Sequence, residues 1–262
     1  MPAQNFRLGL VSISFRPLSP AQIIEKCVAA QLEGIEWGGD VHVPHGDIQT
    51  AREVARQTRD AGLEIPTYGS YYRCDHDGEF PFQAALDCAL ELRAPCVRVW
   101  AGKTDAKDAK IADFVRVAAD LERICDLSSA HGVQIVTEFH GGTLTATGAD
   151  ALDLLRMAPR AKTLWQPLRR APGFAPQIEE NLAELELVAP FLSHVHVYEW
   201  GDDEAGNRRM FSLEESAQWP FYVQKLREIG EQNRWLLLEY VPENDPEVLA
   251  READALRGIL SF

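Results

Sequence analysis

The sequence predicts a single α/β domain over residues 1–262, folded as a (β/α)8 barrel with a parallel eight-stranded core. Three observations predict this fold class. The chain has 262 residues, close to the roughly 250 that such a barrel takes. Short apolar runs alternate with longer amphipathic stretches eight times, as in parallel βαβ units. Residues 14–19, after the first run, lack the glycine-rich phosphate turn that the rival fold, an open doubly wound sheet, usually carries.

The first four units have helix signals at their borders. Ser19 and Pro20 form an N-cap followed by proline at the first helical position. Gly34 and Gly62 fall where helices should end and strands begin. We expect strands over 6–15, 34–38, 65–72 and 96–101, followed in turn by helices over 19–33, 47–61, 80–92 and 110–131.

The last four units repeat this pattern. Gly132 separates a long helix from the next strand, and Asp245 with Pro246 starts the last helix as Ser19 and Pro20 start the first. We expect strands over 133–140, 163–168, 194–200 and 235–241, followed in turn by helices over 149–157, 176–188, 213–230 and 246–260.

Composition excludes several classes of protein. Apolar residues make up 46% of the chain and charged residues 25%, enough for a large core and against disorder. The formal charge of −14 repels phosphate backbones and anionic lipids, so we expect neither a nucleic acid nor a membrane partner. The sequence contains no run of 18 apolar residues and no secretion signal. We therefore expect a cytoplasmic protein.

The five cysteines are scattered and none forms a CxxC pair. Such cysteines are typically small buried thiols in a reducing compartment, so we expect neither a disulfide framework nor a zinc site of cysteines.

The predicted strand ends are rich in polar and aromatic side chains, and the C-terminal ends of barrel strands carry the active site. Residues two apart share a face of a strand, so His194 and His196 point into the barrel while Val195 faces the helices. Glu138 and Glu239 each lie in an otherwise apolar strand. A carboxylate there is costly to bury unless it is paired, hydrogen-bonded or bound to a cation.

Four of these side chains lie at equivalent heights on four consecutive strands: Glu138, Gln166, His196 and Glu239. Each alone has an ordinary explanation, because a strand-end glutamate is often salt-bridged and an inward histidine is more often a core residue than a ligand. As a set they can converge near the barrel axis. Oxygen ligands with one imidazole suit Mg²⁺ or Mn²⁺, and Zn²⁺, Co²⁺ or Fe²⁺ also accept them. The set predicts a divalent metal site, with ordinary pairing as the alternative.

Tryptophans also gather at the predicted strand ends, namely Trp37, Trp100, Trp165 and Trp200. These tryptophans either pack under the loops or provide a platform for the apolar face of a sugar ring. We assign Trp100 to the second role.

These residues resemble the xylose-isomerase-like barrel superfamily of sugar phosphate isomerases and epimerases over nearly the whole chain. The resemblance is carried by Gly34-Ile-Glu-Trp-Gly38, Glu138-Phe-His140, His194-Val-His196 and Leu237-Leu-Glu239. It implies a divalent metal held by Glu138, His196 and Glu239, with Gln166 where relatives have an aspartate. Because glutamine is neutral, this departure lowers the expected affinity for a hard cation such as Mn²⁺ or Mg²⁺.

The resemblance also implies a reaction. Glu138 and Glu239 would flank the substrate, one removing a proton beside a carbonyl and the other returning it to the resulting enediolate on the opposite face. The substrate would be a small sugar, polyol or hydroxy-ketone. The remaining residues that we assign to substrate binding are His140, Arg208, Glu36 and His45. Relatives often form dimers or tetramers, so the resemblance further implies a homodimer or homotetramer.

Three alternatives stay open. A dehydratase or lyase begins with the same proton abstraction. A metal-free sugar-binding barrel without catalysis would explain Gln166. A nuclease of the abasic-site endonuclease type shares the superfamily fold, but seven histidines and a charge of −14 disfavour its multi-metal centre and its basic DNA face.

Overall fold

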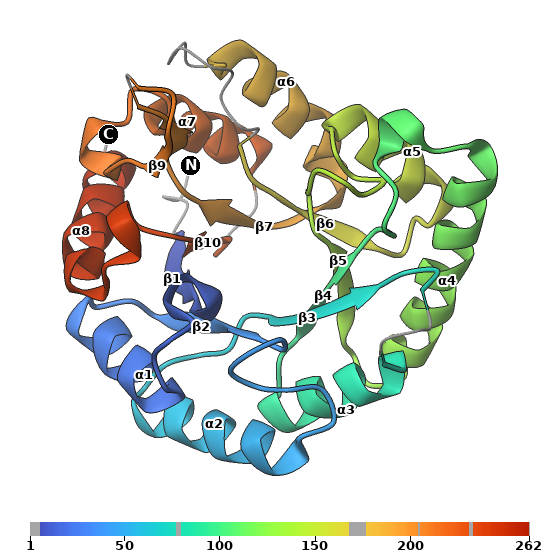
Figure 1. Cartoon of the computed structure of the whole chain (residues 1–262), viewed down its shortest axis with the longest axis horizontal. Helices are drawn as coiled ribbons and strands as arrows, with labels where there is room; N and C mark the ends of the chain where they lie inside the picture. Colours follow the sequence, from blue (N-terminus) through green and yellow to red (C-terminus); the bar gives the residue numbers. More distant parts are fainter. Residues whose placement is uncertain (1–5, 77–79, 168–176, 204, 231–232, 262) are drawn as a thin grey trace.

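The computed structural model describes residues 6–76, 80–167, 177–203, 205–230 and 233–261. Its central feature is a closed barrel of eight parallel strands, in the order β1-β10-β7-β6-β5-β4-β3-β2, with eight α-helices around it (Figure 1). The strands are β1 Arg7–Val11, β2 Gly34–Gly38, β3 Tyr68–Arg73, β4 Cys96–Trp100, β5 Gln134–Thr137, β6 Lys162–Trp165, β7 Leu192–Val197 and β10 Trp235–Leu238. The predicted (β/α)8 fold is confirmed, and the open doubly wound sheet is excluded.

The eight helices follow the predicted order: α1 Pro20–Ala29, α2 Ile48–Asp60, α3 Phe82–Leu92, α4 Ile111–Ser129, α5 Gly148–Met157, α6 Ile178–Val188, α7 Trp219–Ile229 and α8 Leu249–Leu260. The predicted start of α1 is confirmed, because the Ser19 side chain accepts the Gln22 N–H in a capping box. Two predicted borders, Leu168 for a strand and Pro176 for a helix, lie outside the described residues. None of the described helices combines the length and hydropathy needed to cross a bilayer.

Several predicted elements were too long, and 3₁₀ turns account for three of them. The first strand ends at Val11, because the chain turns into a 3₁₀ helix, Ser12–Phe15, in which the Ser14 hydroxyl donates to the Val11 carbonyl. The last two predicted helices begin with separate 3₁₀ turns, Leu213–Glu215 and Pro246–Val248.

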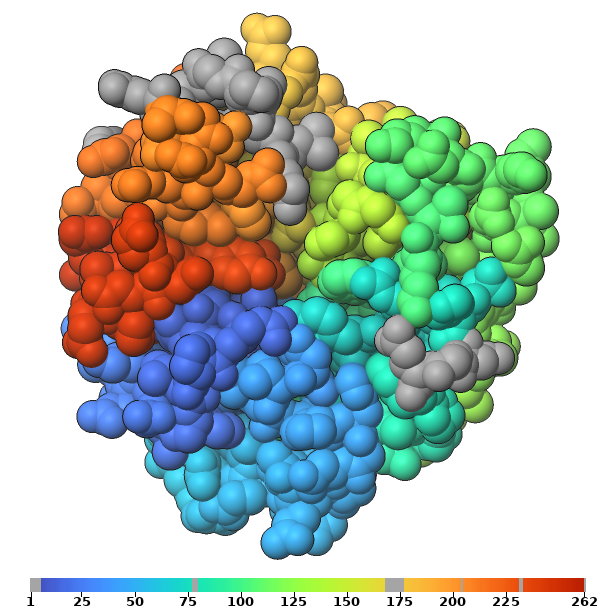
Figure 2. Space-filling view, in the orientation of Figure 1, coloured from blue at the N-terminus to red at the C-terminus, as the bar shows by residue number. Residues whose placement is uncertain are grey.

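The seventh strand also ends earlier than predicted, and the chain then forms an antiparallel hairpin that the sequence did not predict. Its strands are β8 Trp200–Asp202 and β9 Arg208–Met210. Glu199 anchors the base of the hairpin, accepting hydrogen bonds from Ser216 and Gln218. In the same orientation, Figure 2 shows blue N-terminal, green central and orange C-terminal parts of the chain meeting around the middle of this face.

Candidate active site

A pocket of about 500 Å³ lies at the C-terminal ends of β5, β6 and β10. Glu138, Gln166 and Glu239 each follow directly after one of these strands, and all three line the pocket. The backbone N–H groups of Glu138 and Glu239 still donate to carbonyls of the neighbouring strands, Val99 and Val197, so the barrel ladder fixes both positions. The remaining lining residues are Phe139, His140, Gly141, Ala146, Pro167, Gln177, Tyr198, Trp200 and Tyr240.

Two of the predicted metal-site residues meet through a hydrogen bond. His196, on β7, is fully buried and its Nδ1 lies 3.2 Å from the Glu239 Oε2 atom. Its Nε2 lies 3.3 Å from the Glu36 Oε2 atom. Burial opposes the charge of this imidazole, but Glu239 and Glu36 outweigh burial and raise the pKa of His196 to about 10. Without a metal, His196 is therefore a cation at neutral pH.

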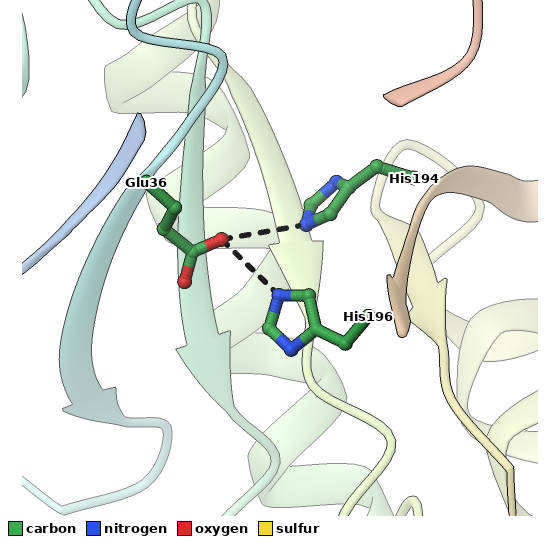
Figure 3. A group of neighbouring side chains, drawn as sticks. All are labelled: Glu36, His194 and His196. Carbon is green, nitrogen blue, oxygen red and sulfur yellow. Dashed lines mark hydrogen bonds and ion pairs between the residues drawn. The ribbon is translucent and has the colours of Figure 1, made fainter. Parts of the chain in front are cut away.

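Glu36 lies on β2 and is fully buried (Figure 3). Its Oε2 atom faces His196 and also the His194 Nε2 atom, at 3.6 Å. Its Oε1 atom accepts a 2.7 Å hydrogen bond from the Arg98 Nε. Burial would raise the pKa of Glu36, but Arg98 and the two histidines hold it well below its usual range. Burial lowers the pKa of His194 below its ordinary value.

Arg98, on β4, was missed by the sequence analysis. It is 1% exposed and donates from Nη1 to the Glu138 Oε2, an oxygen that also accepts the Trp100 indole N–H. The available signal was a charged residue in the middle of an apolar strand, Cys-Val-Arg-Val-Trp. The same signal, a charged side chain in an otherwise apolar strand, predicted Glu138 and Glu239 as site residues. Arg98 thus bonds two of the three buried carboxyl groups, Glu36 and Glu138, and His196 meets Glu36 and Glu239.

Two sets of side chains have the chemistry to hold a metal. Within the described part of the chain, the ligand atoms of Glu36, His194 and His196 are the only group of three from His, Cys, Asp or Glu that lie within 4.8 Å of one another. Arg98 pairs with Glu36 in that group and also with Glu138 in the predicted set, so its positive charge opposes a bound cation at either. The predicted set of Glu138, Gln166, His196 and Glu239 is more widely spread, with three of its members on the pocket wall.

Gln166 is the least satisfied member of the predicted set. Its amide N–H donates to the Phe139 carbonyl at 2.6 Å, which turns Oε1 the other way. That oxygen is buried and has no hydrogen-bond partner among the described residues. A buried acceptor without a partner costs free energy. A cation or a substrate hydroxyl in the pocket would satisfy it.

The residues predicted to bind substrate are dispersed. His140 lines the pocket, and its ring stacks on Trp100 with centroids 4.5 Å apart. Arg208 lies on β9, half exposed, with its guanidinium 5.4 Å from the ring of Trp200, which lines the pocket. Outside the pocket wall, His45 stacks on Phe80 at 3.6 Å and its Nε2 meets the Ser70 carbonyl. Glu36 holds His196 and Arg98 from within the barrel.

Comparison with known proteins places the chain among similar barrels. The family model described as xylose isomerase-like TIM barrel matches residues 24–259. No curated protein sequence matches the chain. Solved structures that resemble it include the probable 3-DHS dehydratase AsbF of Bacillus anthracis, with a TM-score of 0.74 and 21% identity over 96% of this chain and 99% of that one. The IOLI protein with a bound zinc atom has a TM-score of 0.77 and 14% identity, with 98% of each chain covered. D-psicose 3-epimerase in the presence of D-fructose has a TM-score of 0.69 and 17% identity, again with 98% of each covered.

Proposed function

The chain belongs to the xylose isomerase-like TIM barrel family, and we propose that it is an isomerase or epimerase of a small sugar, polyol or hydroxy-ketone. The observation that carries the proposal is the shared pocket of Glu138 and Glu239, whose carboxylates come from two different strand ends. Two carboxylates around one pocket can remove a proton beside a carbonyl and return it to the other face of the enediolate. The similarity to D-psicose 3-epimerase is consistent with this chemistry.

The pocket wall suits a polyhydroxylated substrate. Tyr198, Trp200 and Tyr240 offer apolar ring surface with polar edges, and Gln166 and Gln177 offer amide groups for hydroxyls. The Trp200 and Tyr240 rings meet edge to face, with centroids 5.8 Å apart. Such a mixture of rings, amides and carboxylates is typical of pockets that fix a small ligand in one orientation.

A divalent cation fits the donor chemistry of Glu138, Gln166, His196 and Glu239. The unpartnered Gln166 oxygen and the two glutamate side chains on the pocket wall favour a cation in this pocket. Glu36 accepts at the His196 Nε2, as a carboxylate does behind many metal-bound histidines, so Nδ1 is the nitrogen that would face the ion. When bound, the cation would polarise the substrate carbonyl. The zinc atom of the IOLI structure provides a precedent among similar barrels.

The experiment is proton exchange in D₂O on a panel of ketoses from tetruloses to hexuloses, followed by ¹H NMR. We expect the wild type to exchange the proton beside the carbonyl of at least one ketose, with Glu138→Gln and Glu239→Gln each slowing exchange by about 10³-fold. An exposed substitution, Gln224→Glu on α7, serves as the control. Exchange that persists in both glutamate variants would refute the assignment of these two residues.

A dehydratase is the second candidate, because it begins with the same proton abstraction and AsbF has a similar fold. The same spectra separate the two activities. Deuterium in a recovered ketose or its epimer indicates isomerisation, whereas loss of the hydroxyl at the neighbouring carbon indicates dehydration. A wild type that binds sugars but exchanges no proton would favour a binding protein.

A further inference from the structure

Arg98 joins the fully buried Glu36 to the Glu138 carboxylate of the pocket wall. We propose that Arg98 is a positioning residue for the reaction, holding the Glu138 carboxylate in one orientation, with Glu36 as the anchor that holds Arg98. This inference rests on the function proposed above, in which Glu138 exchanges a proton with substrate.

The hydrogen bonds at Glu138 fix which of its oxygens can react. Both the Arg98 Nη1 and the Trp100 Nε1 donate to the same atom, Oε2. The two donors lie two residues apart on the same face of β4 and together hold this oxygen in place. The other oxygen, Oε1, is then the atom that can exchange a proton.

Glu36 fixes the other end of the guanidinium. It accepts from Nε at 2.7 Å, and its second oxygen is held by His196 and His194. Because the guanidinium is a rigid planar group, two bonds to different carboxylates set its orientation. A lysine could supply the same charge but only a single point of attachment.

Gly69 on β3 provides the space for this arrangement. A Cβ atom at this position would lie 2.5 Å from the Arg98 Nη2 and 2.8 Å from the Glu36 Oε1. Neither atom can move freely, because the Glu36 and Arg98 side chains are buried and form an ion pair with each other. Any side chain at residue 69 therefore displaces the pair that holds Glu138.

The test compares Arg98→Lys, the double variant Glu36→Gln/Arg98→Met, and Gly69→Ala. The double variant removes one charge of each sign and so avoids an unpaired Glu36, which would endanger folding. Gly258→Ala, in α8 with open space around its Cβ, is the matched glycine control. The first readout is kcat and KM for the ketose that the wild type exchanges fastest.

A misplaced carboxylate should lower kcat and leave KM nearly unchanged, because substrate binding does not depend on one oriented oxygen. We expect about a 100-fold loss of kcat in the double variant and Gly69→Ala, and about tenfold in Arg98→Lys, with KM within about threefold. The loss should persist at pH 9. Full activity in Arg98→Lys or in the double variant would overturn the proposal.

The second readout needs no activity. The Trp100 indole proton shares Oε2 with Arg98, so its ¹H–¹⁵N resonance, assigned with Trp100→Phe, reports the position of the carboxylate. We expect this resonance to shift in the double variant and in Gly69→Ala but not in Gly258→Ala. If the wild type exchanges no ketose proton, the proposed function fails, and the resonance alone decides whether Arg98 positions Glu138: an unchanged resonance would overturn that role.

Discussion

The two candidate acid–base residues have different surroundings at the scale of single side chains. Glu138 is held by Arg98 and Trp100 on one oxygen, whereas Glu239 meets the imidazole of His196. Both carboxylates face the pocket, where Gln166 contributes a neutral amide. The proposed function therefore depends on two fixed carboxylates and on how strongly the neutral amide between them supports a cation.

Gln166→Asp should bind a divalent cation more tightly, by about tenfold, because a charged oxygen replaces a neutral one. The measurement is calorimetric titration of chelator-treated protein with Mn²⁺ at pH 8. Because His196 must lose its proton to ligate, affinity should also fall between pH 8 and pH 6 in both proteins. Gln224→Asp, exposed on α7, controls for added charge. Equal affinities in all three proteins would rule out Gln166 as a ligand.

The pH dependence of stability should reveal how much the ionised Glu36 side chain contributes to the free energy of unfolding. Its pKa in the fold is well below the usual value, so the folded state binds fewer protons than the unfolded chain in acid. Its stabilising contribution is complete above about pH 4.5 and is lost as pH falls toward the folded pKa. Urea unfolding of metal-free protein between pH 7 and pH 3.5 should therefore show that the free energy of unfolding falls more steeply in the wild type than in Glu36→Gln. Parallel curves would contradict this account.

At the scale of elements, strand ends carry the chemistry and one added element shapes the pocket. Glu138, Gln166 and Glu239 follow the last residues of β5, β6 and β10, where parallel strands end on the same face. The hairpin of β8 and β9 brings Trp200 to the pocket wall and Arg208 near that ring. Tyr240, just after β10, has a φ of 61° and donates its N–H to Ser14 Oγ. An unfavourable backbone conformation held by such a bond is common at binding sites.

Arg208→Gln should raise KM about fivefold and leave kcat unchanged, because loss of the cation beside Trp200 weakens binding by about 1 kcal/mol without altering the acid–base groups. Steady-state kinetics on the exchanged ketose measures both constants. Arg209→Gln is the matched control, since Arg209 pairs with Asp203 at 3.1 Å. Equal effects of the two substitutions would remove Arg208 from the substrate-binding residues.

At the scale of the whole molecule, closure of the barrel brings the first and last strands together. β1 pairs with both β2 and β10, and Gly9 lies opposite Gly34 and Leu237 in these pairings. A Cβ at Gly9 would lie 2.7 Å from the Gly34 carbonyl oxygen and equally close to the Leu237 side chain. The backbone of Gly34 cannot move away without separating β1 from β2. We call the pairings of β1 with β2 and β10 the seam.

Gly9→Ala should therefore destabilise the protein by about 2 kcal/mol through overpacking at this seam. Gly258→Ala should instead stabilise it by about 0.5–1 kcal/mol, because a helical glycine with open space gains by becoming alanine. Urea denaturation followed by circular dichroism measures both. A Gly9→Ala protein as stable as the wild type would show that the seam adjusts freely.

The sequence by itself determined the eight strand–helix units, the parallel barrel and the face that carries the pocket, because hydrophobic periodicity and helix caps are local signals. It also indicated Glu138, Gln166 and Glu239 as neighbours, since equivalent strand ends meet when a barrel closes. Only the tertiary structure decided the partners. His196 faces Glu36, and Arg98 reaches Glu138, because strands far apart in the chain are staggered in a particular way. The space left at Gly69 is also needed. Such side-chain pairings follow from packing across the barrel, which no local pattern encodes.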